Sequence, residues 1–539
     1  GQMHITPPST QAGALMRSVN VPVNFYTGVA NINIPLYGIG LKSLQVPVQL
    51  CYQASGIKVN DAATWVGLGW RLSAGGRISR MVKGGGADEK GFCKPSVSSS
   101  DGYIAQNLPQ WTLKTTEQRL EDKFDSESDL FYFEFPGGTG RFMVDYDGRA
   151  WEMPYQNLKI EWFDKTLPSS YFKITNDAGI QYIFKAIETS MYKQESDKEN
   201  GEDELEYYPS SWNLTQIIDY NGNKIDFTYT SGPVQYNSMQ NVYTTMENDE
   251  EKEVETKNVQ ITHYPQYLKS IVWKNGKIEF LSDSIRYGNT YVIRLQELRI
   301  SQHDHDVRSF AFSYGTFDNG SLKLVSVTEK NEGTEGDYYL FGYNTGYSLP
   351  SRSSRNTDHF GYYNGPDSYK GYDYPQGGYN DSLPSRGDDK EPHWPYTQAD
   401  ILTEIRYKGG GKKVFDYEEQ KTDICTSAGV RIKQIKEYEN SNSAPRSTKY
   451  IYLKSNTDGT LTGNSSGEVY QPQVDYAISN SNIIVSGRHS YIILNSNENS
   501  LYDVSGAAIV YSEVREVLPN GAYNIYKYST FSTEYCNGE

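Results

Sequence analysis

Short runs of apolar or alternating residues recur along the whole chain, separated by turn-forming residues. They include residues 46–52 (VPVQLCY), 130–135 (LFYFEF), 181–184 (QYIF), 224–229 (KIDFTY), 291–295 (YVIRL) and 482–485 (NIIV). Gly, Asn, Asp, Ser or Pro bound each run, which is typical of short strands joined by turns. A sustained apolar period of 3.6 residues is hard to find, so the pattern predicts an all-β chain with little helix.

A unit made of a strand, a turn and a second strand that ends in an aromatic residue recurs in the second half. The units cover residues 214–229, 268–280, 322–343, 402–417 and 432–452. Asn221-Gly222 predicts a type I′ turn, because both central residues of that turn need positive φ, and Asn275-Gly276 marks a second turn. A hairpin cannot bury a face alone, so we expect many antiparallel hairpins that join into large, partly curved sheets.

Other segments are too polar or too irregular for strands. The acidic stretches 195–206 and 247–255 are expected to be solvated loops, and residues 349–398, rich in Gly, Pro, Tyr and Ser, form a long excursion that covers a sheet edge or marks a boundary. The predicted organisation is an opening module (1–90), a β-rich domain (91–210), hairpin repeats (211–348), the excursion (349–400), and further, truncated hairpin repeats (401–539).

Composition removes several function classes. The 539 residues exceed what one core serves, so several domains or a repeat architecture are expected. With 51 basic and 67 acidic residues the net charge is −16, which argues against nucleic acid as a partner. No apolar run is long enough to predict a membrane-spanning segment. The 46 tyrosines suit wide, half-wet sheets, since tyrosine joins strand-compatible bulk to a polar tip.

The four cysteines do not form a recognisable metal or redox motif. Cys51, Cys93, Cys425 and Cys536 lie far apart and make no CxxC pair, which excludes zinc-ribbon and thioredoxin-type sites. A disulfide between two of them and buried free thiols both stay open.

The first hundred residues carry an ordered series of motifs. It runs through residues 33–36 (NIPL), 46–50 (VPVQL), 55–57 (SGI), 65–70 (WVGLGW) and 72–80 (LSAGGRISR). Two tryptophans five residues apart around glycines allow a backbone to pass close beneath indole rings. We therefore expect structural roles for Trp65, Gly67, Gly69, Trp70, Gly75 and Gly76.

This series resembles the opening module of the large Rhs proteins, with YD repeats, that bacteria of the Bacteroides group export. It resembles more distantly the start of toxin-complex B components and of plasmid-virulence-type toxins. The likeness continues in the same order at residues 129–133, 140–142, 172–175, 212–217, 358–365, 429–435 and 511–514.

The resemblance implies a secreted or cell-surface protein whose signal peptide has been removed. In such relatives the YD repeats form a β-sheet shell around a toxic C-terminal domain, and related shells cut themselves near an Asp-Pro motif. This chain has no Asp-Pro dipeptide and reaches Glu539 before the expected repeat core. We therefore expect a fragment or a short member that needs a protein partner or a C-terminal continuation.

Two motifs with catalytic or metal-binding patterns have stronger structural explanations, and a third stays open as a calcium candidate. Ser465 sits in a G-x-S-x-G pattern, but no helix signal follows it, so a Ser/Gly loop is favoured. His303 and His305 could share one strand face with a metal, but without a partner cluster a polar hairpin turn is favoured. Residues 145–148 (DYDG) are a calcium candidate without EF-hand spacing, and no other cofactor is indicated.

The Tyr-rich excursion offers the remaining ligand candidates. Asp358 and His359 open a DHFGYYNG element that is either a buried structural corner or a ligand contact, and Tyr362, Tyr363 and Trp394 could offer flat rings to a glycan. The first hypothesis is a non-catalytic shell or scaffold that encloses, displays or docks another polypeptide, with a concave sheet wall and no convergent polar pocket. The alternatives are a carbohydrate-binding or adhesive surface protein, and a hydrolase around Ser465 or a carboxylate pair.

Overall fold

The computed structural model describes residues 19, 21–41, 44–82, 129–144, 148–164, 167–194, 204–247, 250–287, 290–303, 305–331, 334–372, 387–408, 410–423, 426–440, 442–469, 477–479, 490–494 and 509–530. Within these ranges the chain is built almost entirely from antiparallel strands, and the helical content is the single 3-10 turn η2 (Tyr396–Gln398). The all-β prediction is therefore confirmed.

A four-stranded antiparallel sheet forms the N-terminal module, in the order β1-β2-β3-β4. One face of β2 and β3 is buried, because Ile32, Ile34, Val48, Leu50 and other alternate residues point to the same side. Its strands are β1 (Val23–Asn24), β2 (Val29–Gly40), β3 (Gln45–Ala54) and β4 (Trp70–Ser73).

A second, curled sheet follows the order β9-β10-β11-β12-β5-β6-β7-β8. Its inner face holds a cluster of aromatic rings in which Trp212 packs edge-on against Phe172 at 4.8 Å and Phe131 stacks on Phe142 at 5.1 Å. Its strands are β5 (Arg77–Met81), β6 (Leu130–Phe135), β7 (Gly138–Val144), β8 (Ala150–Met153), β9 (Lys159–Phe163), β10 (Tyr171–Thr175), β11 (Gln181–Gln194) and β12 (Glu204–Ile218).

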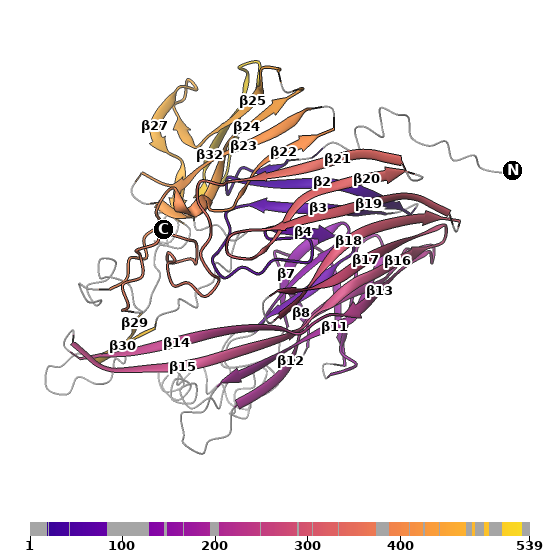
Figure 1. Ribbon diagram of the computed structural model, residues 1–539, viewed down its shortest axis with the longest axis horizontal. Helices are drawn as coiled ribbons and strands as arrows, with labels where there is room; N and C mark the ends of the chain where they lie inside the picture. The colour runs from indigo at the N-terminus through magenta and orange to yellow at the C-terminus, as the bar shows by residue number, and fades with distance from the viewer. Residues whose placement is uncertain are drawn as a thin grey trace.

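A long antiparallel sheet starts from the same β12 and wraps around the N-terminal module (Figure 1). Its order is β12-β13-β16-β17-β18-β19-β20-β21-β22-β23-β24-β25-β32-β33. Its remaining strands are β13 (Lys224–Ser231), β16 (Gln266–Trp273), β17 (Gly276–Tyr287), β18 (Thr290–Gln302), β19 (His305–Thr316), β20 (Leu322–Asn331), β21 (Thr334–Tyr343), β22 (Leu402–Tyr407), β23 (Lys412–Lys421), β24 (Thr426–Tyr438), β25 (Arg446–Ile451), β32 (Glu513–Val517) and β33 (Tyr523–Lys527).

A long hairpin, β14 (Gln235–Glu247) and β15 (Glu250–Tyr264), projects from the body along one side (Figure 1). At the base of this hairpin, β15 pairs with β11. On its other side β14 pairs with β30 (Ser490–Leu494), which in turn pairs with β29 (Ala477–Ser479). The expected solvated loop at 247–255 is therefore wrong, because residues 250–255 pair with β14. Two small ribbons complete the fold: β26 (Leu453–Ser455) with β27 (Leu461–Ser465), and β28 (Gly467–Val469) with β31 (Ile509–Tyr511).

All five predicted hairpin units are present, but the predicted type I′ turn at Asn221-Gly222 is wrong. Gly222 has a φ of +80°, whereas Asn221 is not among the residues with positive φ. Asp219 and Asn223 close a three-residue loop with Gly222 at its last position, and the Asp219 carboxylate accepts the N–H groups of Asn221 and Asn223. This geometry is a type I turn followed by a glycine bulge.

The same loop recurs at five other places in the described chain. In each, a residue pairs with the fourth residue after it, and the third residue after it is a glycine with positive φ. These glycines are Gly179, Gly320, Gly410, Gly459 and Gly521.

A β-bulge directly follows a buried Leu or Ile in six of the long strands. Register shifts occur at or just after Leu214, Leu268, Leu295, Leu324, Leu402 and Ile432. A bulge bends a strand and increases its local twist. Its repetition at equivalent places gives the long sheet a consistent bend.

At five of these six bulges, a tyrosine side chain forms a hydrogen bond to the bulged strand. Each tyrosine lies in a later strand or, for Tyr452, directly after β25, and its hydroxyl donates a 2.7 Å hydrogen bond to the carbonyl of the Leu or Ile before the bulge. The pairs are Tyr229 with Leu214, Tyr314 with Leu295, Tyr343 with Leu324, Tyr417 with Leu402, and Tyr452 with Ile432. We call each of these pairs a tyrosine latch. Four of the five predicted units end in a latch tyrosine, whereas the unit at 268–280 ends in Phe280, which has no hydroxyl.

Candidate functional site

The loop at residues 65–70 joins the N-terminal module to the long sheet. Its main chain exchanges hydrogen bonds with two strands, since Leu295 N–H donates to the Trp65 carbonyl and Leu68 N–H donates to the Leu322 carbonyl, both at 2.8 Å. Gly67 approaches the same sheet so closely that a Cβ there would lie 3.0 Å from the Leu324 nitrogen.

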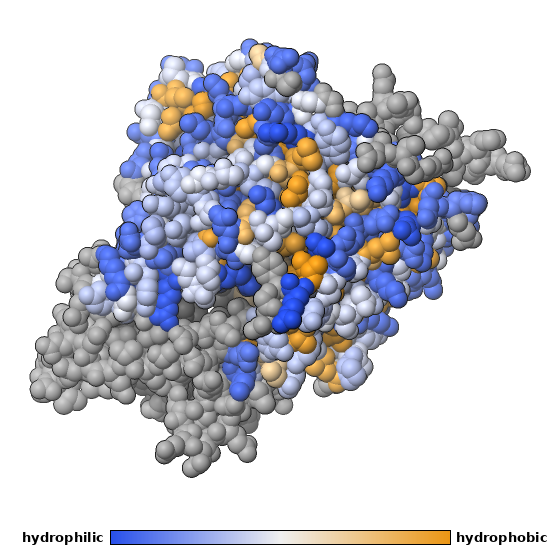
Figure 2. Space-filling view, in the orientation of Figure 1, coloured by the Kyte–Doolittle hydropathy of each residue, from blue (hydrophilic) through white to orange (hydrophobic). Residues whose placement is uncertain are grey.

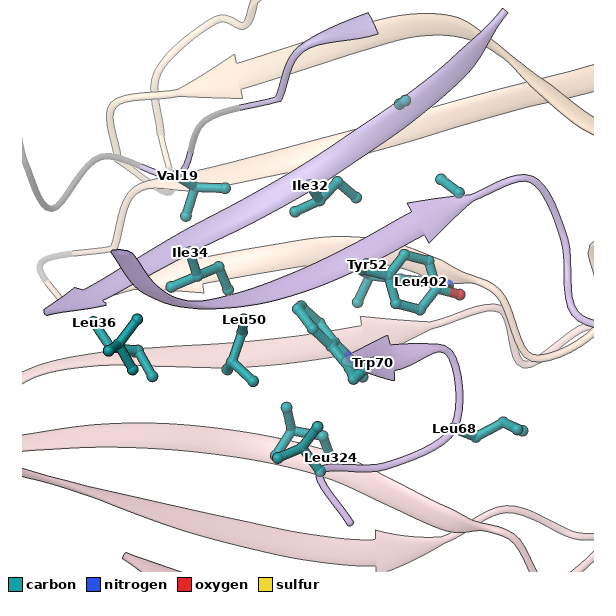
Figure 3. Close-up of a cluster of buried hydrophobic side chains, with 14 of the residues drawn as sticks. Val19, Ile32, Ile34, Leu36, Leu50, Tyr52, Leu68, Trp70, Leu324 and Leu402 are labelled. Atoms are coloured by element: carbon teal, nitrogen blue, oxygen red, sulfur yellow. Dashed lines mark hydrogen bonds between the residues drawn. The ribbon is translucent and has the colours of Figure 1, made fainter. Parts of the chain in front are cut away.

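Trp70 is buried among aromatic rings at the centre of this junction (Figure 3). Its ring lies 5.2 Å from that of Tyr52 and 4.7 Å from that of Phe341. Its indole Nε1 donates to the Tyr343 hydroxyl at 2.8 Å, and that hydroxyl forms one of the tyrosine latches. Burial raises the pKa of Tyr343 well above its ordinary value, so this phenol stays neutral.

Further bonds from the N-terminal module reach successive bulges of the long sheet. The N–H groups of Leu214, Leu402 and Ile432 donate to the Gly76 carbonyl, the Tyr52 hydroxyl and the Gly28 carbonyl, at 2.9, 3.0 and 2.9 Å. The bulges leave these N–H groups outside the strand ladder, and the module supplies their acceptors.

The glycines singled out in the sequence lie at close approaches. A Cβ on Gly69, whose φ is +77°, would lie 2.5 Å from the Tyr52 ring, and one on Gly76 would lie 2.6 Å from the Glu134 carbonyl oxygen. Gly75 has a φ of +138° and packs against Phe227. Together with Trp65, these residues form the contact between the module and both sheets.

A cleft of about 610 Å³ opens where the N-terminal module, the curled sheet and the β14–β15 hairpin meet. Glu188 is its best-connected polar group. The carboxylate accepts from Arg77 at 2.7 Å, Ser211 at 2.8 Å, Asn213 at 3.3 Å and the Gln266 N–H at 3.2 Å. On the opposite wall Arg71 forms an ion pair with Glu134. The expectation of no convergent polar pocket is therefore wrong, although these charges pair with one another.

One Ser–His pair lies beside this cleft. The Ser190 hydroxyl is 2.7 Å from His263 Nδ1, and burial lowers the pKa of His263, so the imidazole is neutral at neutral pH. Ser190 is fully buried, which keeps its hydroxyl from a substrate. The pair therefore does not have the exposed nucleophile that acyl transfer needs.

Sequence reasoning missed Arg77, Glu188 and His263 as a group. They come from β5, β11 and β15, which are distant along the chain, and they share no motif. The only available signal was Arg77 inside the GGRISR stretch.

Asp358 forms a buried corner in the excursion. Its Oδ1 accepts the N–H groups of Phe360 at 2.8 Å and Tyr362 at 3.0 Å, and burial raises its pKa to about 6. The Tyr362 ring is buried close to Gly56 and Gly429, so it does not offer a face to a glycan. His359 lies 3.7 Å from Glu391.

The other predicted ring residues diverge in exposure. Tyr363 is half-buried and packs edge-on against Tyr396 at 5.4 Å, while Trp394 is 38% exposed. The excursion residues therefore do not present one continuous aromatic platform among the residues that the structure describes.

The remaining candidates have structural surroundings. The Ser465 hydroxyl donates to the Lys421 carbonyl and accepts from Gly467 N–H, and Ser465 ends a strand that leads to another strand, not to a helix. His303 lies in the tight turn before β19, as the favoured interpretation predicts. Within the described residues no cluster of His, Cys, Asp and Glu could hold a metal.

Some candidates cannot be placed. Asp145 and its two neighbours in the calcium candidate, and Cys93, Cys425 and Cys536, lie outside the described residues. Cys51 is described and is a free thiol whose pKa is raised by burial.

Comparison with known proteins gives distant structural likenesses only. No family model and no curated protein matches. A crystal structure of TcdB2-TccC3 covers 97% of this chain at 11% identity, with a TM-score of 0.34 and 28% of its own length. The Tc holotoxin pore of Photorhabdus luminescens covers 95% of this chain at 10% identity, with a TM-score of 0.34 and 24% of its own length.

A shorter protein is matched over part of the chain. The N-terminal domain of the effector SpvB from Salmonella typhimurium covers 56% of this chain at 9% identity, with a TM-score of 0.27 and 98% of its own length. The chain thus spans about a quarter of the toxin-complex chains that it resembles. At these identities the family assignment from the motifs stays a prediction.

None of the described segments is a helix with the length and apolar character needed to cross a membrane.

Proposed function

We propose that this chain is a non-catalytic, exported β-scaffold that docks another polypeptide. The observation that carries the proposal is how the polar groups of the 610 Å³ cleft are used. Its charged side chains pair with one another, and the Ser190 hydroxyl of its Ser–His pair is buried. A catalytic group needs a free proton site or nucleophile within reach of a substrate.

The hydrogen bonds that fix the curvature of the long sheet support a role as a rigid scaffold. Five tyrosine latches and the bonds from the N-terminal module hold successive strands of one long wall in a fixed bend. Figure 2 shows one face of the molecule, on which the described residues are mostly polar with separate hydrophobic patches. Such patches are common where one protein contacts another.

Co-production with the polypeptides encoded next to this chain tests the proposal. We expect a stoichiometric complex that survives size-exclusion chromatography with light scattering, and unchanged complex formation with Ser465→Ala. A chain that stays alone with every neighbour, or a hydrolytic activity that Ser465→Ala abolishes, would overturn it.

A further inference from the structure

The outer edge of β4 has free backbone groups. Thr64 Oγ1 donates to the Trp70 carbonyl at 2.7 Å, and Trp70 N–H donates to the Gly67 carbonyl at 3.2 Å, so the Trp70 backbone points away from β3. Backbone groups alternate in direction along an antiparallel strand, so the N–H and C=O of Leu72 point the same way. In the described part of the chain, β4 pairs only with β3, and Leu72 has no hydrogen bond on that outer side.

This free edge faces the cleft. Leu72 and Ala74 line the 610 Å³ cleft, and Ser73, Gly75 and Glu134 line both this cleft and a neighbouring space of about 440 Å³. Spaces of roughly 300 to 1,000 Å³ are typical of ligand sites. We call these two adjoining spaces beside β4 the groove.

The walls of the groove favour an uncharged main chain over a charged ligand. Arg77 pairs with Glu188, Arg71 pairs with Glu134, and Arg80 is held by Asp129, so the walls carry no free charge for an anion or cation. His263 is neutral. What remains unpaired at the edge of β4 is one donor and one acceptor of Leu72, the pattern that an extended peptide matches.

We propose that this groove binds an extended segment of a partner polypeptide, which adds as a strand to the edge of β4 at Leu72. Addition of a strand to an exposed edge is a common mode of peptide recognition, in which main-chain hydrogen bonds supply affinity and side-chain pockets supply specificity. The inference rests on the proposed function, since it names where the docked polypeptide is held. Trp65 and Tyr267, whose rings lie 5.6 Å apart in the cleft wall, supply the apolar contact for its side chains.

The test uses a display library of random peptides of about ten residues, selected on the whole chain. We expect selected peptides to slow amide exchange at Leu72 at least tenfold, and to lose at least tenfold in affinity when their alternate amides are N-methylated, because methylation removes the donors of a strand pair. The methylated peptide leaves the protein unchanged, so this arm does not depend on the folding of any variant.

A matched pair of variants locates the site. Ser73→Trp fills the groove beside the edge, whereas Lys224→Trp places the same ring on an exposed position of β13 outside it. We expect Ser73→Trp alone to abolish binding. Selected peptides that bind both variants equally, tolerate N-methylation or leave Leu72 unprotected would overturn the inference, as would a library that yields no binder. An uncharged oligosaccharide that protects Leu72 where no peptide does would also overturn it.

The two proposals can fail separately. If a complex with a neighbouring polypeptide forms equally well with Ser73→Trp, the proposed peptide site in the groove is contradicted and the proposed scaffold function is retained. If the selected peptides meet every expectation but no stable complex forms in co-production, the scaffold function is contradicted and the peptide site in the groove is retained.

Discussion

The hydroxyl of Tyr343 connects three elements through one oxygen. It accepts from the Trp70 indole of the N-terminal module and donates to the Leu324 carbonyl of β20, while its own residue ends β21. Both partners are buried and would stay unpaired without the oxygen.

Tyr343→Phe should therefore lower the free energy of unfolding by roughly 2 to 6 kcal/mol, because an unpaired buried group costs about 1 to 3 kcal/mol and two are created. Urea unfolding followed by tryptophan fluorescence measures the change. Tyr220→Phe, at a hydroxyl-bearing side chain that is 63% exposed, is the control and should change it by less than about 0.5 kcal/mol. Equal effects of the two variants would contradict the role of the latch.

Substitutions at Gly69 and Gly137 allow the cost of a steric contact to be measured apart from the cost of backbone strain. Both have positive φ, but a Cβ on Gly69 meets the Tyr52 ring at 2.5 Å while one on Gly137 meets nothing within 4 Å. Gly137→Ala should cost only the backbone strain, about 1 kcal/mol, and Gly69→Ala should cost at least about 2 kcal/mol more because Tyr52 must move. Thermal unfolding of both variants would show the difference, and similar midpoints would refute the argument from contact.

Asp358 gives the fold a defined pH dependence. Its folded pKa of about 6 lies above the ordinary value of 3.8, so its stabilising contribution is complete below about pH 4 and is lost as the pH rises through about 6. The loss is up to roughly 3 kcal/mol.

Asp358→Asn keeps an oxygen acceptor and removes the titration. The variant should therefore gain on the wild type in free energy of unfolding as the pH rises from 4 to about 7, measured by urea unfolding at each pH. Asp400, whose pKa burial also raises to about 6, titrates in the same direction in both proteins and cancels in the difference. A constant difference across this range would show that Asp358 does not carry the effect.

At the scale of the element, the bulge after each buried Leu or Ile sets which face its strand presents. Deleting Thr403, which follows Leu402 in β22, should shift the register and move alternate side chains of the strand to the opposite face. We expect no soluble folded protein from this deletion. Thr403→Val, which keeps the residue count, and deletion of Asn442 in the loop before β25 should both give soluble protein with near wild-type far-UV circular dichroism. Soluble protein from the Thr403 deletion would contradict a fixed register.

The strands and hairpins could be predicted from the sequence because their signals are local. The aromatic end of each unit, such as Tyr417, was visible as a pattern. Its hydroxyl partner was not, because Leu402 becomes available only through a bulge that no local signal marks. The turn at Asn221 differed from the prediction because the Asp219 carboxylate stabilises a longer loop. The cleft required the meeting of β5, β11 and β15, which depends on the whole topology.

At the scale of the molecule, the N-terminal module acts as a common binding partner for strands from β12 to β24. Its carbonyls bind the N–H groups of Leu214, Leu295 and Ile432, and its Tyr52 hydroxyl binds that of Leu402, in four different parts of the long sheet. A substitution that removes contacts at the centre of the module should therefore destabilise strands along the whole sheet.

Trp70→Ala should increase amide exchange in β20 and also in β24, which Trp70 itself does not hold, because both strands share the module as a support. Leu461→Ala, in the peripheral ribbon β27, should leave exchange in both strands unchanged. An effect of Trp70→Ala confined to β20 and β21 would show that the module's contacts act independently.

The bond between Tyr52 and Leu402 joins residues 350 positions apart. At about 5 to 20 residues per second, synthesis reaches Leu402 roughly 20 to 70 seconds after Tyr52. Throughout that interval the buried face of β2 and β3, with Ile32, Val48 and Leu50, lacks β24, a strand that packs against both of them. The nascent module is thus the part of this protein that most needs a chaperone on the ribosome. The sheet that later covers its apolar face is the same sheet that the module stabilises in the folded protein.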